Sequence, residues 1–469
     1  MVCFIHEGEK MINTQYNALP SYCVLTRSNV SRFAIVLFVA LLVLWQGVVF
    51  GTVPNTFYMG GPSTITADVA DGASETSGSL MVYSGVNEII KIGGGTWIIN
   101  GGYVNTDLPT APAIKLKEGT IDIRYNSSGN SSVSGYLTMD AGTTIISDIT
   151  EHLRRNNQYS VSNVMLNLTG SGNIVINEGK SFGVKMISGQ HTEFSGAISG
   201  ENVTFAVYCH DDSDSSFTLS GSNSFTGELL VRRGVRLILT DDAIASIASV
   251  KIDDATNSTL EYNVKSGTKR LDLTDGKVIK GCQVGSSLSY EGNYGKIEKT
   301  GSGTLPINTE TNESIKVERF AIVSGRVDYQ GYFDSFVRSG IDIQDGAVFS
   351  SGLSDSNTIG NAILGSAITL AFEAAALFEF NSYSDEPDSR LFDAIAIDKN
   401  SRSDSVLFKQ QSDSFIELAL SSETEKWAEK DAKYLLISDE RIDSDPGDSQ
   451  ILNDDCIYRM ANHKDIFQF

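Results

Sequence analysis

Short runs of alternating apolar and polar residues, each closed by Gly, Asn, Asp or Ser, limit this chain to few folds. In residues 235–239, which read VRLIL, Val235, Leu237 and Leu239 fall on one side of an extended chain. A period of two is typical of strands with one buried face. The same pattern recurs in residues 260–264, 271–273, 327–329, 341–343, 368–372, 395–397 and 416–420. The sequence therefore predicts an all-β fold.

The spacing of these runs favours a solenoid over a β-sandwich. Neighbouring runs lie about 10 to 13 residues apart, so two strands and their corners make a coil of about 20 to 25 residues. The pattern continues for about 400 residues without a helical interruption, which is longer than one sandwich usually accommodates. Gly and Asn suit the corners because both adopt positive φ. We expect a single parallel β-helix, in which each strand pairs with the coils above and below it.

The charge of the chain excludes one large class of partners. Its 469 residues carry 36 Lys and Arg against 58 Asp and Glu, a formal net charge of -22. Such a surface repels phosphate backbones and anionic lipid, so we expect no nucleic-acid partner. It suits solubility, cations or a basic partner.

Residues 33–50, FAIVLFVALLVLWQGVVF, are almost wholly apolar and follow a polar extension, residues 1–32. The length fits either a signal peptide or a membrane anchor. Small residues at Val49 and Gly51 favour cleavage before Thr52. We therefore assign residues 33–52 to a signal peptide or signal anchor. The expected location is extracellular or on the outer cell surface, with membrane contact only through residues 33–50 if they are retained.

One stretch carries a family resemblance. Residues 219–227 read LSGSNSFTG and are followed by a strand, Gly234, the alternating run 235–239 and a short Asp/Ala turn at residues 241–246. This order resembles the repeat of the autotransporter-associated β-strand family. A second copy opens at residues 297–305 and closes at residues 323–327. Pro306 stands there where the family has a strand residue, so we expect a bulge in that coil.

The resemblance implies a right-handed parallel β-helix of the kind found in secreted bacterial passenger domains. Weaker copies cover residues 93–102, 119–123 and 170–176. We expect a β-helix with these repeats over residues 53–365, and further coils over residues 366–469 with no membrane β-barrel. The family's repeat residues are structural, so no catalytic residue is carried over from it.

The densest polar cluster is residues 209–216, CHDDSDSS, where Asp211, Asp212 and Asp214 could hold Ca²⁺ through hard oxygen ligands. The spacing lacks the Gly and distal Glu of an EF-hand loop, so an exposed acidic loop is the preferred interpretation. A second cluster, residues 443–448, contains Pro-Gly and is interpreted as a turn.

Other candidate chemistry has little support. No Gly-x-Ser-x-Gly elbow occurs, and His152, His191 and His210 have no context that marks a general base. The glycines of residues 93–95 lead into a strand rather than a helix, which argues against a phosphate loop. An odd number of cysteines, Cys209, Cys282 and Cys456, follows the apolar segment, so they cannot all pair within the chain. We predict no catalytic, cofactor-binding or metal residues and no cofactor.

Two functions remain open. We favour a non-catalytic structural or adhesive scaffold that presents loops to glycans or to cell-surface or matrix components. Arg232 and Arg233 could contact an acidic glycan, although outward-facing strand and corner charges are the simpler interpretation. The alternative is a polysaccharide lyase or glycoside hydrolase working in a lateral groove of the β-helix, by analogy of fold alone. A groove in which Asp and Arg or Lys converge would favour the enzyme.

Overall fold

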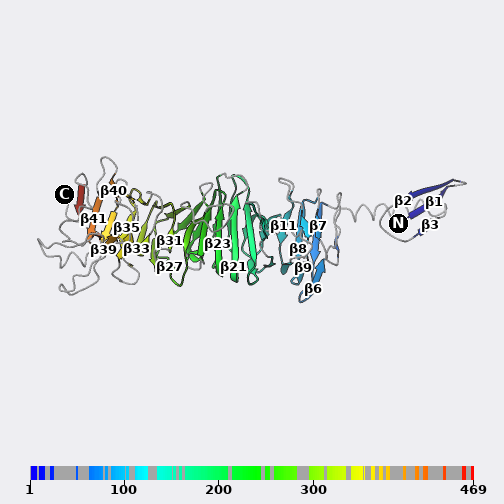
Figure 1. Cartoon of the computed structure of the whole chain (residues 1–469). Coiled ribbons are helices and arrows are strands. Elements are labelled where there is room, and N and C mark those ends of the chain that lie inside the picture. Colours follow the sequence, from blue (N-terminus) through cyan, green and yellow to red (C-terminus); the bar gives the residue numbers. More distant parts are fainter. Residues whose placement is uncertain are drawn as a thin grey trace.

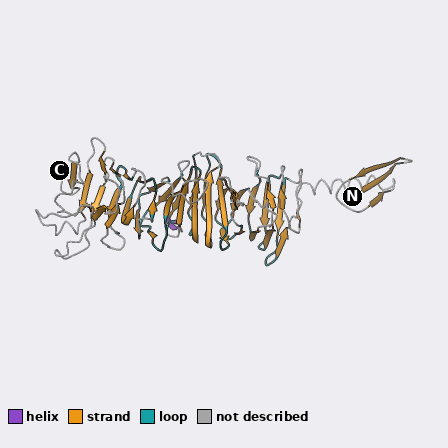
Figure 2. Ribbon diagram, viewed as in Figure 1, coloured by secondary structure: helices purple, strands orange, loops and turns teal. Residues whose placement is uncertain are grey.

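The structure, a computed structural model, describes residues 63–77, 86–100, 111–124, 135–149, 164–209, 214–244, 249–253, 258–282, 295–310, 314–333, 340–351 and 353, and the backbone of strands outside these ranges. It confirms the predicted parallel β-helix. Labelled strands follow one another along one axis in chain order (Figure 1). Among the described residues the helical element is a single short turn, η1 (Asp241–Ala243), in the predicted Asp/Ala turn (Figure 2).

Each coil contributes up to three strands, which stack into three parallel ladders. Stack 1 runs through β4 (Val49–Phe50), β5 (Thr64–Asp68), β8 (Glu88–Ile92), β11 (Ala113–Leu116), β13 (Tyr136–Met139), β17 (Val164–Gly170), β20 (His191–Phe194), β22 (Ser215–Leu219), β24 (Val235–Thr240), β26 (Thr259–Asn263), β29 (Lys296–Thr300), β32 (Arg319–Ile322), β34 (Ile341–Ile343), β37 (Thr369–Phe372) and β40 (Leu407–Gln410).

Stack 2 has two runs. The first contains β6 (Ser74–Ser77), β9 (Thr96–Asn100), β12 (Thr120–Arg124), β14 (Thr144–Asp148), β18 (Asn173–Ile176) and the starts of β21 (Ile198–Cys209) and β23 (Ser224–Arg232). The second contains β27 (Leu271–Leu273), β30 (Thr304–Thr309), β33 (Arg326–Phe333), β35 (Val348–Ser351), β38 (Leu377–Phe380), β41 (Ile416–Leu420) and β43 (Ile457–Met460).

Stack 3 is the least continuous ladder. It contains β7 (Leu80–Val82) with β10 (Gly102–Val104), then β19 (Ser181–Met186), the ends of β21 and β23, β25 (Ser249–Asp253), β28 (Ile279–Cys282) and β31 (Ile315–Lys316), and finally the end of β33 with β36 (Asn361–Leu364), β39 (Ala394–Ile397) and β42 (Ile437–Asp439).

The remaining strands pair outside these ladders. They are β1 (Val2–Glu7), β2 (Lys10–Gln15) and β3 (Tyr22–Leu25) in one small sheet, the antiparallel hairpin of β15 (His152–Arg154) and β16 (Gln158–Ser160), and β44 (Ile466–Gln468), antiparallel to β43.

The expectation of two strands in each coil was wrong. In β21 and β23 the second and third strands of a coil form one long strand that bends without a separate corner. β21 pairs with β18 at Ile198, shifts register between Gly200 and Val203, and then pairs with β19. Gly200 at φ 152° and Asn202 at φ 52° make this bend possible.

Alternation along the strands builds the core. Leu219, Val235, Leu237 and Leu239 are buried, as the sequence predicted, and Arg236 lies on the outer side. Phe182, Phe205 and Phe225 come from three successive coils and pack against one another inside. The first two rings are stacked with centroids 6.1 Å apart, and the Phe225 ring is tilted against that of Phe205. A cavity of about 10 Å³ near Trp97 has an apolar lining, so it offers no polar partners for a bound water. The interior is therefore packed by side chains.

Glycines stack at one corner of the coil because neighbouring backbones approach closely there. A Cβ on Gly196 would lie 1.7 Å from the Gly172 carbonyl oxygen, and a Cβ on Gly221 would lie 2.0 Å from that of Gly196. Asn223 closes this corner, since its Oδ1 accepts from the Ile198 amide at 3.2 Å and its Nδ2 donates to the Gly221 carbonyl at 3.2 Å. The Ser-Gly-x-Asn sequence thus forms a corner rather than a site.

One local expectation, the bulge at Pro306, needs correction. β30 keeps an unshifted register with β33 through Pro306, so the coil does not bulge there. Proline has no amide to donate, and the β27 ladder with β30 covers only residues 307–309. Arg232 lies on the outer side of β23 as predicted, but only 7% of it is exposed, so it is not a solvated charge.

The ends of the chain are only partly described. Within the predicted export segment, β4 pairs parallel to β5, and the rest of that segment lies outside the described residues. In the described part, no helix has the length and apolarity needed to cross a membrane. Beyond residue 365, strands β37 to β42 pair parallel to the preceding strands of the three ladders.

Candidate functional site

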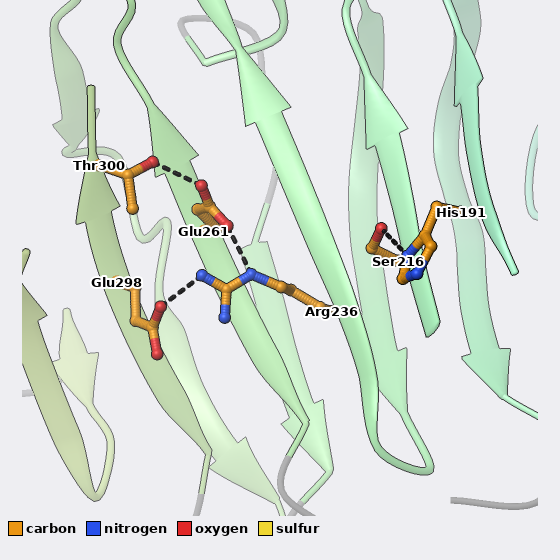
Figure 3. Close-up of polar contacts among 6 residues, drawn as sticks. All are labelled: His191, Ser216, Arg236, Glu261, Glu298 and Thr300. Carbon is orange, nitrogen blue, oxygen red and sulfur yellow. Dashed lines mark hydrogen bonds and ion pairs between the residues drawn. The ribbon is translucent and has the colours of Figure 1, made fainter. Parts of the chain in front are cut away.

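The outer face of stack 1 carries an ion network across three consecutive strands (Figure 3). Arg236 on β24 donates from Nε to Glu261 Oε2 on β26 at 2.5 Å and from Nη2 to Glu298 Oε2 on β29 at 2.5 Å. Thr300 Oγ1 donates to the other oxygen of Glu261 at 2.5 Å. These residues meet because they occupy outward positions of strands whose inward neighbours, such as Leu237 and Ile297, fill the core.

The electrostatics of this network favour a fixed ion cluster. Burial by itself would lower the pKa of Arg236, but hydrogen bonds and charge from Glu298 and Glu261 outweigh it and raise that pKa. Glu261 is the most enclosed member, with 7% of its side chain exposed, and both of its oxygens accept hydrogen bonds. A glycoside hydrolase needs one carboxyl that holds a proton and a second one free to act. Here one guanidinium bridges both carboxylates, which suits cross-linking of coils better than proton transfer.

A Ser–His pair lies on the same face (Figure 3). His191 Nδ1 on β20 lies 2.8 Å from Ser216 Oγ on β22, and the contact is exposed to solvent. A hydrolytic triad would need an acidic group that orients the imidazole and a donor pair for the oxyanion. The nearby Glu193 instead accepts a hydrogen bond from Ser220 Oγ at 2.6 Å. The pair is therefore a hydrogen-bonded contact on the surface, in line with the lack of a sequence context that marks His191 as a general base.

The acidic cluster at residues 209–216 is only partly described. Cys209 is buried at the end of β21, with its sulfur 3.5 Å from Ser215 Oγ, and Asp214 is exposed. His210, Asp211 and Asp212 lie outside the described residues.

Several other candidate residues from the sequence also lie outside the described part or are described by their backbone alone. Residues 443–448 and Cys456 also lie outside the described part, and for His152 and Cys282 only the strand backbone is described. Over the part of the chain that is described, no three His, Cys, Asp or Glu side chains are placed to hold a metal ion. Arg233 forms a corner at φ 54° before Gly234.

Two buried lysines were not predicted from the sequence. Lys91 Nζ donates to the Ile92, Gly93 and Glu118 carbonyls at 2.7, 2.5 and 3.2 Å. Lys299 Nζ donates to the Thr300, Gly301 and Ser324 carbonyls at 2.9, 2.8 and 3.0 Å. Both side chains are fully buried.

The two lysines share a sequence pattern that could have revealed them. Residues 91–96 read KIGGGT and residues 299–304 read KTGSGT, so each Lys-x-Gly-x-Gly-Thr ends a stack 1 strand and begins a stack 2 strand. In each case the ammonium binds two carbonyls of its own corner and one carbonyl of the next coil. We call these the lysine corners. Their chemistry is structural, since every proton of each ammonium is bound to backbone oxygen.

No family model, curated protein or solved structure matches this chain.

Proposed function

We propose that the protein is a secreted or cell-surface β-helix passenger-like protein, a non-catalytic scaffold that presents loops to glycans, cell-surface or matrix components. The observation that carries this proposal is the outer face of the coils, where charged side chains pair with the neighbouring coil. Besides the Arg236 network, Lys115 pairs with Glu88 and Arg319 pairs with Asp342, each across adjacent strands of stack 1. Charges used in this way stiffen a rod.

Insertions between strands support the presenting role. The stretch of chain between Leu260 and its partner Ile297 is longer than the stretch between Leu237 and its partner Leu260. The second coil is therefore longer by a loop, while the ladder keeps its register. The hairpin of β15 and β16 is inserted in the same way between β14 and β17. A solenoid tolerates such loops because each coil depends only on its neighbours. Loops of different length can therefore be displayed along one axis.

The alternative, a polysaccharide lyase or glycoside hydrolase, is favoured by one observation. Glu261 and Glu298 lie with Arg236 on a lateral face, which is where such enzymes act on this fold. The Arg236 guanidinium, which bridges both carboxylates, argues against an enzyme at this position.

The test combines a measurement of molecular shape by X-ray scattering with an assay for glycan cleavage. The purified full chain is expected to scatter X-rays as an elongated rod and to release no products from pectin, alginate, mucin-type or matrix glycans. Turnover that Glu298→Gln abolishes, with the rod scattering unchanged, would overturn the proposal in favour of the enzyme. Glu88→Gln is the matched control, because it removes a paired carboxylate from the same face at a distant coil.

A further inference from the structure

The outer face of stack 2 is almost free of charge near the start of the solenoid, where β6 and β9 are labelled in Figure 1. Five strands build it, β6, β9, β12, β14 and β18, and they pair in parallel with no register shift. Inward neighbours such as Trp97 and Ile145 fill the core, so alternation turns two columns of side chains outward. The first column is Ser74, Thr96, Thr120, Thr144 and Asn173, and the second is Thr76, Ile98, Asp122, Ile146 and Val175. We call these ten residues the neutral face.

The neutral face is accessible and its first column has unused polar groups. Nine of the ten residues are exposed or partly exposed, and Asp122 is the buried exception. The hydroxyl and amide groups of the first column make no hydrogen bond with another side chain or backbone group of the described residues. These groups are therefore available to a ligand, and no bond within the described part of the chain has to break first.

Charge selects the kind of ligand. Asp122 is the one formal charge of the neutral face, and its Oδ2 accepts from Arg124 Nε at 2.9 Å and Nη2 at 2.7 Å. The outer face of stack 1 carries ion pairs, and the chain as a whole has a net charge of -22. Acidic polymers, and a second copy of this acidic chain, are repelled by such a molecule. The neutral face therefore suits an uncharged partner.

The spacing of the two columns selects an extended polymer. Paired strands lie about 4.8 Å apart, so the first column offers a polar group at regular intervals along the axis of the rod. A β-1,4-linked glycan chain is extended and advances by about one strand spacing for each sugar, so successive sugar hydroxyls meet successive groups of the column. The aliphatic side chains of Ile98, Ile146 and Val175 then lie against the C–H groups of the sugar rings, which removes apolar surface from water.

We propose that the neutral face binds an uncharged, extended β-linked glycan of the cellulose type, laid along the axis of the β-helix. This rests on the proposed function and names the class of glycan that the scaffold holds. The first column supplies hydrogen bonds and the second supplies apolar contact. A single hydrogen bond contributes little in water, so the affinity depends on several successive coils.

The experiment measures retention of the full chain on phosphoric-acid-swollen cellulose and its affinity for cellohexaose by calorimetry. We expect binding to both, and none to soluble starch, whose α-linked chain coils, or to polygalacturonate, which is acidic. We also expect the affinity to stay the same as salt rises, because no ion pair is formed. Equal binding of starch, or binding that is lost at high salt, would overturn the neutral face.

The decisive variant is Thr96→Val with Thr144→Val, which removes two hydroxyls and keeps the shape and strand preference of threonine. It is expected to weaken cellohexaose binding about tenfold, as the loss of two hydrogen bonds predicts. Thr96→Ser with Thr144→Ser keeps the hydroxyls and is expected to retain binding. The matched control is Thr66→Val with Thr218→Val, two outward threonines of stack 1 that are also partly exposed. It is expected to leave the affinity unchanged.

The remaining outcomes separate this proposal from the proposed function. Circular dichroism and X-ray scattering check the fold of each variant, and equal loss in both valine pairs would overturn the neutral face. A dimer that only the Thr96 and Thr144 valine pair dissociates would assign the face to a second copy. A rod that binds no β-linked glycan refutes the neutral face and leaves the scaffold standing. Cleavage of cellohexaose refutes the non-catalytic scaffold, and the face is then judged by whether its valine pair raises KM more than the control pair does.

Discussion

The two lysine corners, far apart in sequence, have the same geometry and different electrostatic surroundings. Lys91 reaches the carbonyl of Glu118 in the next coil, and Lys299 reaches that of Ser324 at the equivalent position. The residue beside the first corner glycine also differs, because Asp68 lies against Gly93 where Asn263 lies against Gly301. The backbone cage is therefore kept while its acidic neighbours are replaced by neutral ones.

The difference shows what a buried ammonium needs. Burial lowers the pKa of Lys91, while Asp68, Glu118 and Asp71 act in the opposite direction. Burial lowers the pKa of Lys299 to about 8. Three backbone carbonyls thus hold a lysine in place in both corners, and nearby carboxylates decide how firmly it keeps its charge.

The largest expected effect tests the cage that both corners share. Gly325→Ala should destabilise by about 2 to 5 kcal/mol, because it adds the strain of a non-glycine residue at φ 73° to a clash. The new Cβ would lie 2.3 Å from the Gly301 carbonyl oxygen. Gly119→Ala should behave alike in the other corner, with its Cβ 2.5 Å from the Gly93 oxygen.

Gly142→Ala is the control for that substitution. Gly142 has φ 80° and no heavy atom within 4 Å of an added Cβ, so only the backbone strain of about 1 to 2 kcal/mol remains. Urea unfolding followed by circular dichroism measures all three variants. Equal losses would show that close approach of the coils does not decide these positions.

A smaller effect is expected from the lysines themselves. Lys299→Met and Lys91→Met should each cost about 1 to 3 kcal/mol, because methionine fills the space but leaves buried carbonyls without a donor. The same urea midpoints measure this loss, with Lys277→Met, a partly exposed lysine near a turn, as the control. A variant as stable as the parent chain would mean that water replaces the ammonium.

The smallest expected effect is the pH dependence of folding stability, which should distinguish the Lys299 corner from the Lys91 corner. The pKa of Lys299 is about 8 in the folded chain and 10.5 when unfolded, so the unfolded state binds more protons between these values and stability rises with pH. The rise should be about 1 kcal/mol from pH 8 to pH 9. Lys299→Met should lack it, which the difference between the two unfolding curves measures.

Exchanging the acidic neighbours sharpens this comparison. Asn263→Asp with Ser324→Glu should raise the pKa of Lys299 and reduce the rise in stability with pH. Asp68→Asn with Glu118→Ser should lower the pKa of Lys91 further and so enlarge the rise in stability with pH that Lys91 contributes. An unchanged pH profile in both exchanges would show that carboxylates do not set the difference between the corners.

The strands were predictable where one local rule decided them. Residues 271–273 and 341–343 alternate around buried apolar side chains, and both form strands. Hydrophobic alternation acts within a single strand, so no knowledge of neighbouring coils was needed. The third strand of each coil was missed because residues 198–209 bend between two stacks without a break that marks a corner.

The lysine corners and the ion network depend on neighbours that sequence alone does not supply. A lysine at an inward position contradicts the hydrophobic pattern, since lysine is almost never fully buried unless it is paired. Its partners here are carbonyls from two coils, and any residue type can supply those. Arg236 meets Glu298 only because an intervening loop leaves the register of β26 and β29 intact.

The reach of each buried lysine into a second coil has a mechanical consequence. Hydrogen bonds between strands point along the rod, so a pull on its two ends loads the junctions between coils in series, and the weakest junction yields first. Lys299 joins the Gly301 and Ser324 carbonyls and so cross-links the two coils at one such junction. Under tension the rod should break at a junction that has no such cross-link, and the lysine corners should remain intact in the resulting fragments.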